Sequence, residues 1–105
     1  MVFMSIEEKN MILEMVDELE ERASIAIGEA NYDDALKIYR EILKAYEALK
    51  MERNCGLTLL SMAKVLLLQG KVENARELVD IASDINSLAV EDKNSVDIPV
   101  VKYSV

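Results

Sequence analysis

Carboxylates are the most abundant groups in this sequence that could do chemistry. It has 20 Asp and Glu residues, one cysteine (Cys55) and no histidine in 105 residues. Histidine is the commonest general base and the commonest transition-metal ligand. A catalytic site or a metal site in this chain would therefore lack its usual residue. The sequence also lacks a glycine-rich phosphate loop, a nucleophile elbow and a paired-cysteine metal motif. We therefore expect a protein with no enzyme activity, no cofactor and no metal site.

Cys55 is the one candidate nucleophile, and two interpretations of it remain open. At the start of a predicted helix, the helix dipole would lower the pKa of its thiol. Without a histidine partner, a buried structural position is the other interpretation. A lone cysteine cannot form an internal disulfide, which fits a reducing compartment.

The net charge of −8 at pH 7 limits the choice of partner. Nucleic acids and anionic membrane surfaces attract clustered Lys and Arg and repel a chain of this charge. The longest apolar run, residues 57–68, contains Lys64 and is shorter than the roughly 20 residues that span a bilayer. Residues 1–10 have neither the basic start nor the apolar block of a secretory leader. The sequence predicts a cytoplasmic protein whose partner is another protein or a second copy of itself, with no nucleic acid and no membrane insertion.

Helices are the regular structure that we expect. One proline and three glycines leave little material for strands and turns, and hydrophobic residues form 51% of the chain. Apolar residues recur at helical spacing in four segments, at about 5–29, 31–51, 55–69 and 72–88. Ser5 and Glu8 form a capping-box pattern at the first start. Asn31 is the expected cap of the second segment, and Gly70 is the expected end of the third.

One pattern occurs twice, forty residues apart, and predicts how the helices are arranged. Its first copy is Leu19, Ala23, Tyr32, Ala35, Tyr39 and Ile42, and its second is Leu59, Ala63, Val72, Ala75, Val79 and Ala82. Each copy has the spacing of a helix, a short turn and a second helix, with alanines where two helices approach closely. We therefore expect an all-α fold of four helices, in which two antiparallel helical hairpins stack as a short solenoid or bundle.

A change of composition near residue 90 divides the chain. We expect one helical domain over residues 1–90, because a chain of this length fits a single core. Residues 91–105 begin as a polar linker and continue with β-branched residues interrupted by Pro99, which disfavours a helix. Two possibilities remain for this C-terminal tail: disorder, or an extended segment in a groove of its own domain or of a neighbour.

Residues 16–88 resemble the tetratricopeptide repeat family. The resemblance rests on residues 31–39 and 69–75, which look like that family's turn and the opening of its second helix. The alanines of the repeated pattern match the small positions at which the two helices of a repeat pack. The forty-residue period is similar to that of the longer-repeat branch of the family.

The sequence departs from the tetratricopeptide pattern in three places. Ala30 stands where the turn glycine is usual, and Leu19 and Leu59 replace a frequent aromatic residue. A second resemblance covers less of the chain, because residues 31–52 are similar to the middle helix of MIT domains. Gly70 interrupts what would be one continuous helix in that family.

The tetratricopeptide resemblance implies protein–protein interaction. First-helix side chains in that family line a concave ligand surface, and some members hold a peptide carboxylate there with Lys and Asn. The matching positions are Asp17, Glu20, Ser24, Ile27, Leu57, Leu60, Lys64 and Leu67. We call these positions without Asp17 the first-helix face and expect them to bind the partner. No carboxylate clamp is evident among them. We expect an adaptor or scaffold that binds a peptide or helix of a partner in an apolar groove. The alternatives are a structural homo-oligomer that uses this groove for self-association, and an MIT-like adaptor.

Three further sets of residues each allow two interpretations. The acidic ridge on the polar side of the first helix is Glu7, Glu14, Glu18 and Glu21. The basic stripe along the second helix is Lys37, Arg40 and Lys44. The methionine strip beside the apolar side of the first helix is Met4, Met11 and Met15. The acidic ridge is either a solvated face or a docking surface for a basic partner. The basic stripe is either paired within its own helix or a docking surface for an acidic ligand. The methionine strip either fills the core or is an adaptable binding surface.

Overall fold

The computed structural model of the chain describes residues 4–92, with side chains as far as Ile85. The regular structure of this region is four helices: α1 (Ile6–Gly28), α2 (Tyr32–Ala48), α3 (Glu52–Leu68) and α4 (Val72–Asp92). No strand occurs among the described residues. The predicted all-α fold with four helices is confirmed for this region.

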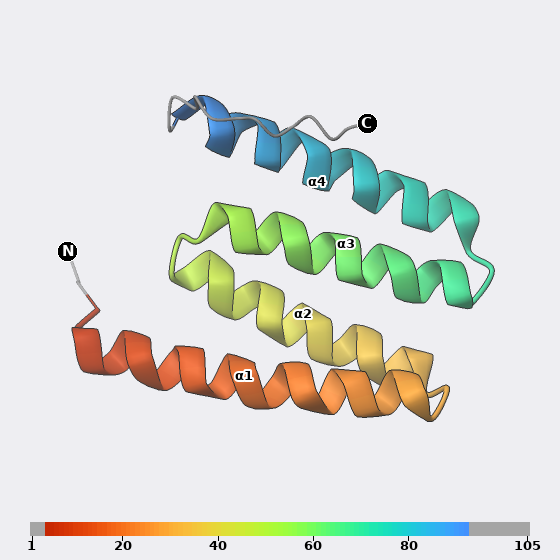
Figure 1. Ribbon diagram of the computed structural model, residues 1–105, viewed down its shortest axis with the longest axis horizontal. Coiled ribbons are helices and arrows are strands. Elements are labelled where there is room, and N and C mark those ends of the chain that lie inside the picture. The colour runs from red at the N-terminus through yellow and green to blue at the C-terminus, as the bar shows by residue number, and fades with distance from the viewer. Residues whose placement is uncertain (1–3, 93–105) are drawn as a thin grey trace.

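The helices lie side by side in the order of the sequence (Figure 1). α1 packs against α2, α2 against α3 and α3 against α4, and these are the extensive helix contacts in the described region. Each connection has only three residues, so consecutive helices run antiparallel. The two predicted hairpins, α1–α2 and α3–α4, therefore form, and the α2–α3 contact stacks one on the other.

The three connections are the same kind of turn. Ala30, Lys50 and Gly70 have positive backbone φ angles of 63°, 58° and 80°. In each turn, the amide of this residue donates to the carbonyl three residues earlier, and the next amide donates to the carbonyl five residues before it. This double bond pattern is the Schellman motif, which closes a helix and favours glycine at the positive φ. The same turn therefore recurs every twenty residues, at positions 30, 50 and 70. The sequence pattern recurs every forty residues, which is once for every two helices.

The helix starts agree with the predicted caps at one position and differ at another. The Glu8 amide donates to the Ser5 Oγ at 3.0 Å and the Ser5 amide donates to the Glu8 Oε1 at 2.9 Å, which confirms the capping box. Asn31 occupies the N-cap position of α2, but its side chain makes no capping hydrogen bond, so that part of the prediction is wrong. The reason is its ψ of 70°, outside the extended region from which N-cap side chains reach the helix.

Two helix ends differ from the sequence prediction. α3 begins at Glu52 instead of Cys55, because the Lys50 turn leaves Met51 as the N-cap residue. α4 continues to Asp92, past the predicted end near residue 88, because neither proline nor glycine stands between Gly70 and Pro99. The helix passes the predicted domain limit at residue 90. The predicted tail beyond residue 92 lies outside the described residues.

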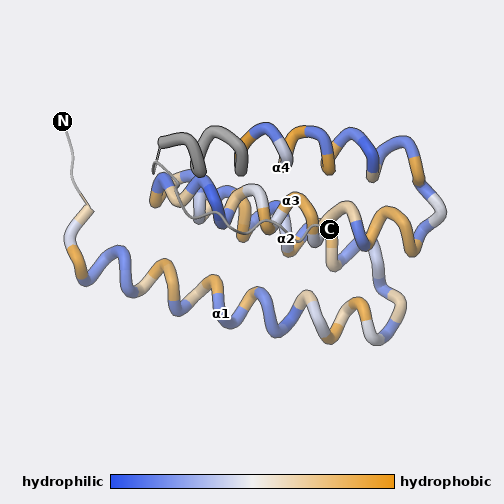
Figure 2. The backbone as a smooth tube through the Cα atoms, turned by 45° about the horizontal axis from the view of Figure 1, so that its top comes forward, coloured by the Kyte–Doolittle hydropathy of each residue, from blue (hydrophilic) through white to orange (hydrophobic). Residues whose placement is uncertain are grey.

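The core consists of two clusters of buried side chains between the helices. The cluster centred on α1 and α2 is Val16, Ile42, Ala45, Tyr46 and Cys55. The cluster that joins all four helices is Ala26, Ala35, Leu36, Leu59, Met62, Ala63, Val65, Leu66, Ala75 and Ala82. The repeated alanines at positions 23, 35, 63 and 75 are at most 2% exposed, as close helix packing requires. Polar and apolar residues alternate along α1 (Figure 2), so one side of that helix faces the core and the other faces solvent.

Candidate functional site

The first-helix face lies on α1 and α3, and its residues differ in burial. Five of its side chains are exposed: Glu20, Ser24, Leu57, Lys64 and Leu67. Leu57 and Leu67 are 52% and 53% exposed, although α3 is otherwise largely buried. Ile27 and Leu60 are half-buried and pack against the four-helix core cluster. The apolar surface that this face offers a partner therefore comes mainly from two leucines of α3.

Tyr39 of α2 joins the α1 and α3 parts of the first-helix face. Its hydroxyl shares a hydrogen bond with Ser61, which lies on the same side of α3 as Leu57 and Lys64. Burial raises the pKa of Tyr39 above 10.0, the charge of Glu20 raises it further, and the Ser61 bond opposes both. The charge of Glu20 on α1 therefore acts on Tyr39 of α2, and the hydrogen bond ties Tyr39 to α3.

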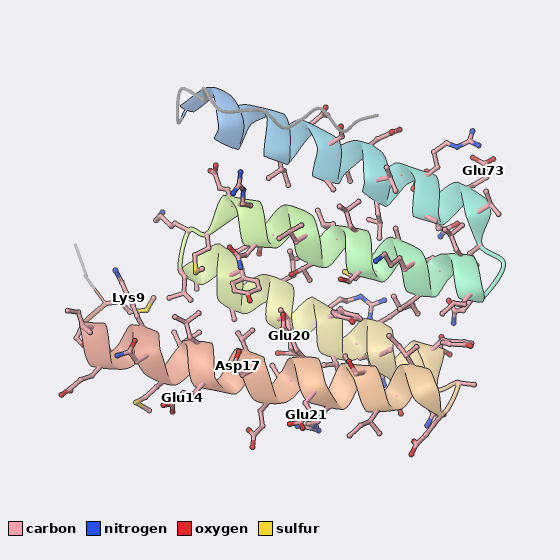
Figure 3. All side chains as sticks on the ribbon, in the orientation of Figure 1. Lys9, Glu14, Asp17, Glu20, Glu21 and Glu73 are labelled. Atoms are coloured by element: carbon pink, nitrogen blue, oxygen red, sulfur yellow. The ribbon has the colours of Figure 1, made fainter. Side chains whose placement is uncertain are left out.

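Tyr46 of α2 is a second phenol whose pKa is affected by carboxylates of α1. It is 8% exposed, and burial is the main reason that its pKa is raised above 10.0. A hydrogen bond with Asn54 lowers the pKa, whereas the charges of Glu20 and Asp17 raise it. Figure 3 shows Asp17 and Glu20 on the side of α1 nearer α2, while Glu14 and Glu21 point away from α2. The charge of Glu20 therefore acts on both phenols, and that of Asp17 acts on Tyr46.

The first-helix face has one carboxylate, Glu20, on α1, and leucines with one lysine on α3. The Tyr39 phenol of α2 is hydrogen-bonded to α3 beside it. Apolar contacts surrounded by polar and charged groups are the usual composition of protein interfaces.

Cys55 is buried in the core. It is 7% exposed and belongs to the cluster of Val16, Ile42 and Tyr46. Burial raises the pKa of its thiol above 9.0, and the charges of Glu47 and Glu52 raise it further. The interpretation in which the helix dipole lowers this pKa is wrong. Its premise fails as well, because α3 begins three residues earlier, at Glu52.

A groove between α1 and α2 was not predicted from the sequence. It measures about 460 Å³ and is lined by Arg22, Ile25, Ala26, Glu29, Asn31, Asp34, Lys37 and Ile38. Ile25 is 56% exposed at its edge, and Ile38 is half-buried. The sequence signal for this groove is an isoleucine on each side of the first turn, Ile25 and Ile38. The groove has an apolar floor and charged walls of both signs.

The acidic ridge is exposed along its whole length. A shallow depression of about 520 Å³ on α1 is lined by Met11, Glu14, Met15, Asp17, Glu18 and Glu21. All six residues come from one helix, so the depression is a gap between long side chains and not a cleft between elements. It shows that the methionine strip and the acidic ridge adjoin each other.

The described residues also bear on metal binding and on membrane spanning. No three of their cysteine and carboxylate side chains come together in a way that could hold a metal ion. Over the same residues, no helix has both the length and the apolar character needed to cross a membrane. The chain matches no protein-family model, no curated protein and no solved structure.

Proposed function

We propose that this protein is a non-catalytic interaction module that binds a peptide or helix of a partner protein through its first-helix face. One observation carries the proposal: Leu57 and Leu67 are each more than half exposed, as is the adjacent Leu68, on a helix that is otherwise largely buried. Full burial of an exposed leucine side chain is worth about 1.5–3 kcal/mol, and each of these half-exposed leucines can contribute about half of that on binding. The tetratricopeptide resemblance, with first-helix positions as the ligand surface, supports the same proposal.

The polar groups beside these leucines support a polypeptide as the ligand. Lys64 and Ser61 lie on the same side of α3, and Tyr39 is hydrogen-bonded to Ser61. Such groups can pair with the backbone or side chains of an extended or helical segment. The proposal includes a cytoplasmic location and a protein as the partner, not a nucleic acid, because the chain has net charge −8 and a single thiol.

The test is a capture experiment from a lysate of the source organism, with the intact chain and a Leu57→Glu/Leu67→Glu variant compared by mass spectrometry. These two positions are preferable to Leu60, because Leu60 is half-buried and its replacement would disturb the core. A protein retained by the intact chain and lost with the variant is the expected result. Its direct binding is then measured with purified components.

A matched control carries Ile6→Glu and Val72→Glu, two apolar positions outside the first-helix face that are 75% and 51% exposed. This control keeps the partner if the proposal is correct. Equal loss of the partner in the control and in the variant contradicts the proposal. Recovery of the bait alone also contradicts it, and favours self-association through the same leucines.

A further inference from the structure

One side of the α1–α2 hairpin carries exposed apolar residues that the proposed function does not use. Met11, Met15 and Ile25 are 67%, 46% and 56% exposed. Their spacing places them on one side of α1, the side on which Ile25 lines the α1–α2 groove. Ile38 of α2 forms the opposite wall of that groove. We call Met11, Met15, Ile25 and Ile38 the hairpin face.

Opposite charges border the hairpin face on its two edges. Glu14, Glu18 and Glu21 of the acidic ridge lie next to the methionines on α1. The basic stripe runs along α2, where Lys37 lines the groove. All six charged side chains are exposed. The acidic ridge and the basic stripe therefore lie on different helices of the hairpin, and Arg22, Glu29 and Asp34 line the groove between these helices.

The acidic and basic residues have the same spacing, read in opposite directions. The acidic residues advance by four and then three positions, and the basic residues by three and then four. Two antiparallel helices would therefore bring three pairs of opposite charge into register. The pairs are Glu14 with Lys44, Glu18 with Arg40, and Glu21 with Lys37.

Within one hairpin, the acidic and the basic member of each pair also lie at nearly the same position along the helix axes. Glu14 stands sixteen residues before the turn residue Ala30, and Lys44 stands fourteen after it. The other two pairs have the same difference of two residues. At a helical rise of 1.5 Å per residue, each pair is offset by about 3 Å, which long side chains span easily.

We propose that the hairpin face binds a second copy of this chain, in a twofold dimer whose axis runs parallel to the helices. Such an axis keeps each residue at its own height and places α1 of one copy over α2 of the other. The acidic ridge then meets the partner's basic stripe on both sides of the interface. The methionines and isoleucines of the two copies meet in the middle, where the adaptable methionine side chains pack against each other.

Charge complementarity selects a second copy over other occupants. A basic partner would pair with the acidic ridge but be repelled by the basic stripe. An acidic partner would pair with the basic stripe but be repelled by the acidic ridge. A twofold contact satisfies both stripes at once, because the same surface is used by each copy. The dimer leaves the first-helix face of each copy free, so it is compatible with the proposed function and independent of it.

The test uses the full chain and two charge-reversed variants, followed by sedimentation equilibrium over a range of concentrations. The acid-reversed variant is Glu14→Lys/Glu18→Lys/Glu21→Lys, and the base-reversed variant is Lys37→Glu/Arg40→Glu/Lys44→Glu. We expect the unaltered chain to dimerise and each variant to dimerise more weakly by about a hundredfold or more. An equimolar mixture of the two variants should form a heterodimer, since every pair is then restored with its signs exchanged.

General electrostatic repulsion predicts the opposite result for the acid-reversed variant. Its three replacements change the net charge from −8 to −2, which weakens repulsion between copies. The control is Glu73→Lys/Asp80→Lys/Asp84→Lys, which makes the same change of charge at exposed positions of α4. The control should dimerise at least as well as the unaltered chain.

A second variant keeps the test decisive if a charge-reversed chain is poorly folded. Met11→Gln/Met15→Gln alters two exposed side chains that contribute little to the core, and it should still weaken the dimer about tenfold or more. A chain that is monomeric at every concentration overturns the proposal. So does a dimer that survives both charge reversals and the methionine variant, or one that is lost only with Leu57→Glu/Leu67→Glu.

Discussion

The two hairpins share one sequence pattern and one kind of turn, yet their cores are filled differently. Ile42 in the α1–α2 hairpin corresponds to Ala82 in the α3–α4 hairpin, and both side chains are 0% exposed. The α3–α4 contact is the most extensive helix contact in the described region. Ala63, Ala75 and Ala82 line it, and small side chains let helix backbones approach closely. The repeat therefore specifies the order and direction of the helices, while side-chain volume sets the distance between them.

Removing the large side chain of the first hairpin should have the largest effect on stability. Ile42→Ala should lower the free energy of unfolding by about 2–5 kcal/mol, through lost apolar burial and the cavity that remains. Urea unfolding followed by circular dichroism measures this change. As a control, Ile81→Ala alters an isoleucine that is 48% exposed and should cost clearly less. Equal costs at the two positions would mean that Ile42 does not fill the first core.

Enlarging the matching small residue of the second hairpin tests the other half of the comparison. Ala82→Ile should lower the free energy of unfolding by about 1–3 kcal/mol, because the closely packed helices must separate to admit it. The same urea experiment detects this loss. Ala48→Ile on exposed α2 surface serves as the control and should cost less than about 1 kcal/mol. A stabilised Ala82→Ile variant would show that the α3–α4 contact has spare volume.

The turns should respond to substitution with opposite signs. Gly70→Ala should cost about 1 kcal/mol of stability, because an L-residue is strained at φ 80°. A Cβ atom there would meet nothing within 4 Å, so the cost comes from the backbone alone. Ala30→Gly and Lys50→Gly remove the same strain and should each raise stability by about 0.5–1 kcal/mol. Thermal unfolding of the three single variants measures these changes, and effects of one common sign would contradict this explanation.

The smallest expected effect concerns alkaline pH and distinguishes the first hairpin, which holds Tyr39 and Tyr46, from the second. Burial raises the pKa of each phenol above 10.0, so the folded chain keeps protons that the unfolded chain releases. The phenols alone should leave stability constant below about pH 9 and lower it as the pH rises through 10. The raised thiol pKa of Cys55 acts with the same sign from about one unit lower. Melting temperatures between pH 8 and 11 show the decline, and Tyr39→Phe/Tyr46→Phe should make it shallower.

Helix existence and order could be predicted from the sequence, but some boundaries could not. Apolar periodicity, the Ser5–Glu8 capping box and Gly70 identify their elements because each is a local signal. The turn at Lys50 has no such signal, since a lysine rarely adopts a positive φ, and the start of α3 was therefore placed three residues late. The equal spacing of positions 30, 50 and 70 is evident only when the backbone angles are known.

The candidate site shows the same division between local and long-range information. The sequence identified Leu57, Leu60 and Leu67 as one side of a helix that is apolar nearly all round. It could not tell that Leu60 packs against the core while the other two remain exposed, because that depends on where α2 and α4 lie. The α1–α2 groove depends on two helices at once, so no single segment predicts it.

The sequential packing of the helices also determines how quickly this chain folds and how it opens. Every extensive contact in the described region joins helices that are neighbours in the sequence. Proteins dominated by such local contacts fold in microseconds to milliseconds. Each terminal helix has its extensive contact with a single neighbour, so opening begins at α1 or α4 and reaches α2 and α3 last. Backbone amides in the two central helices are therefore the slowest in the chain to exchange their hydrogens with water.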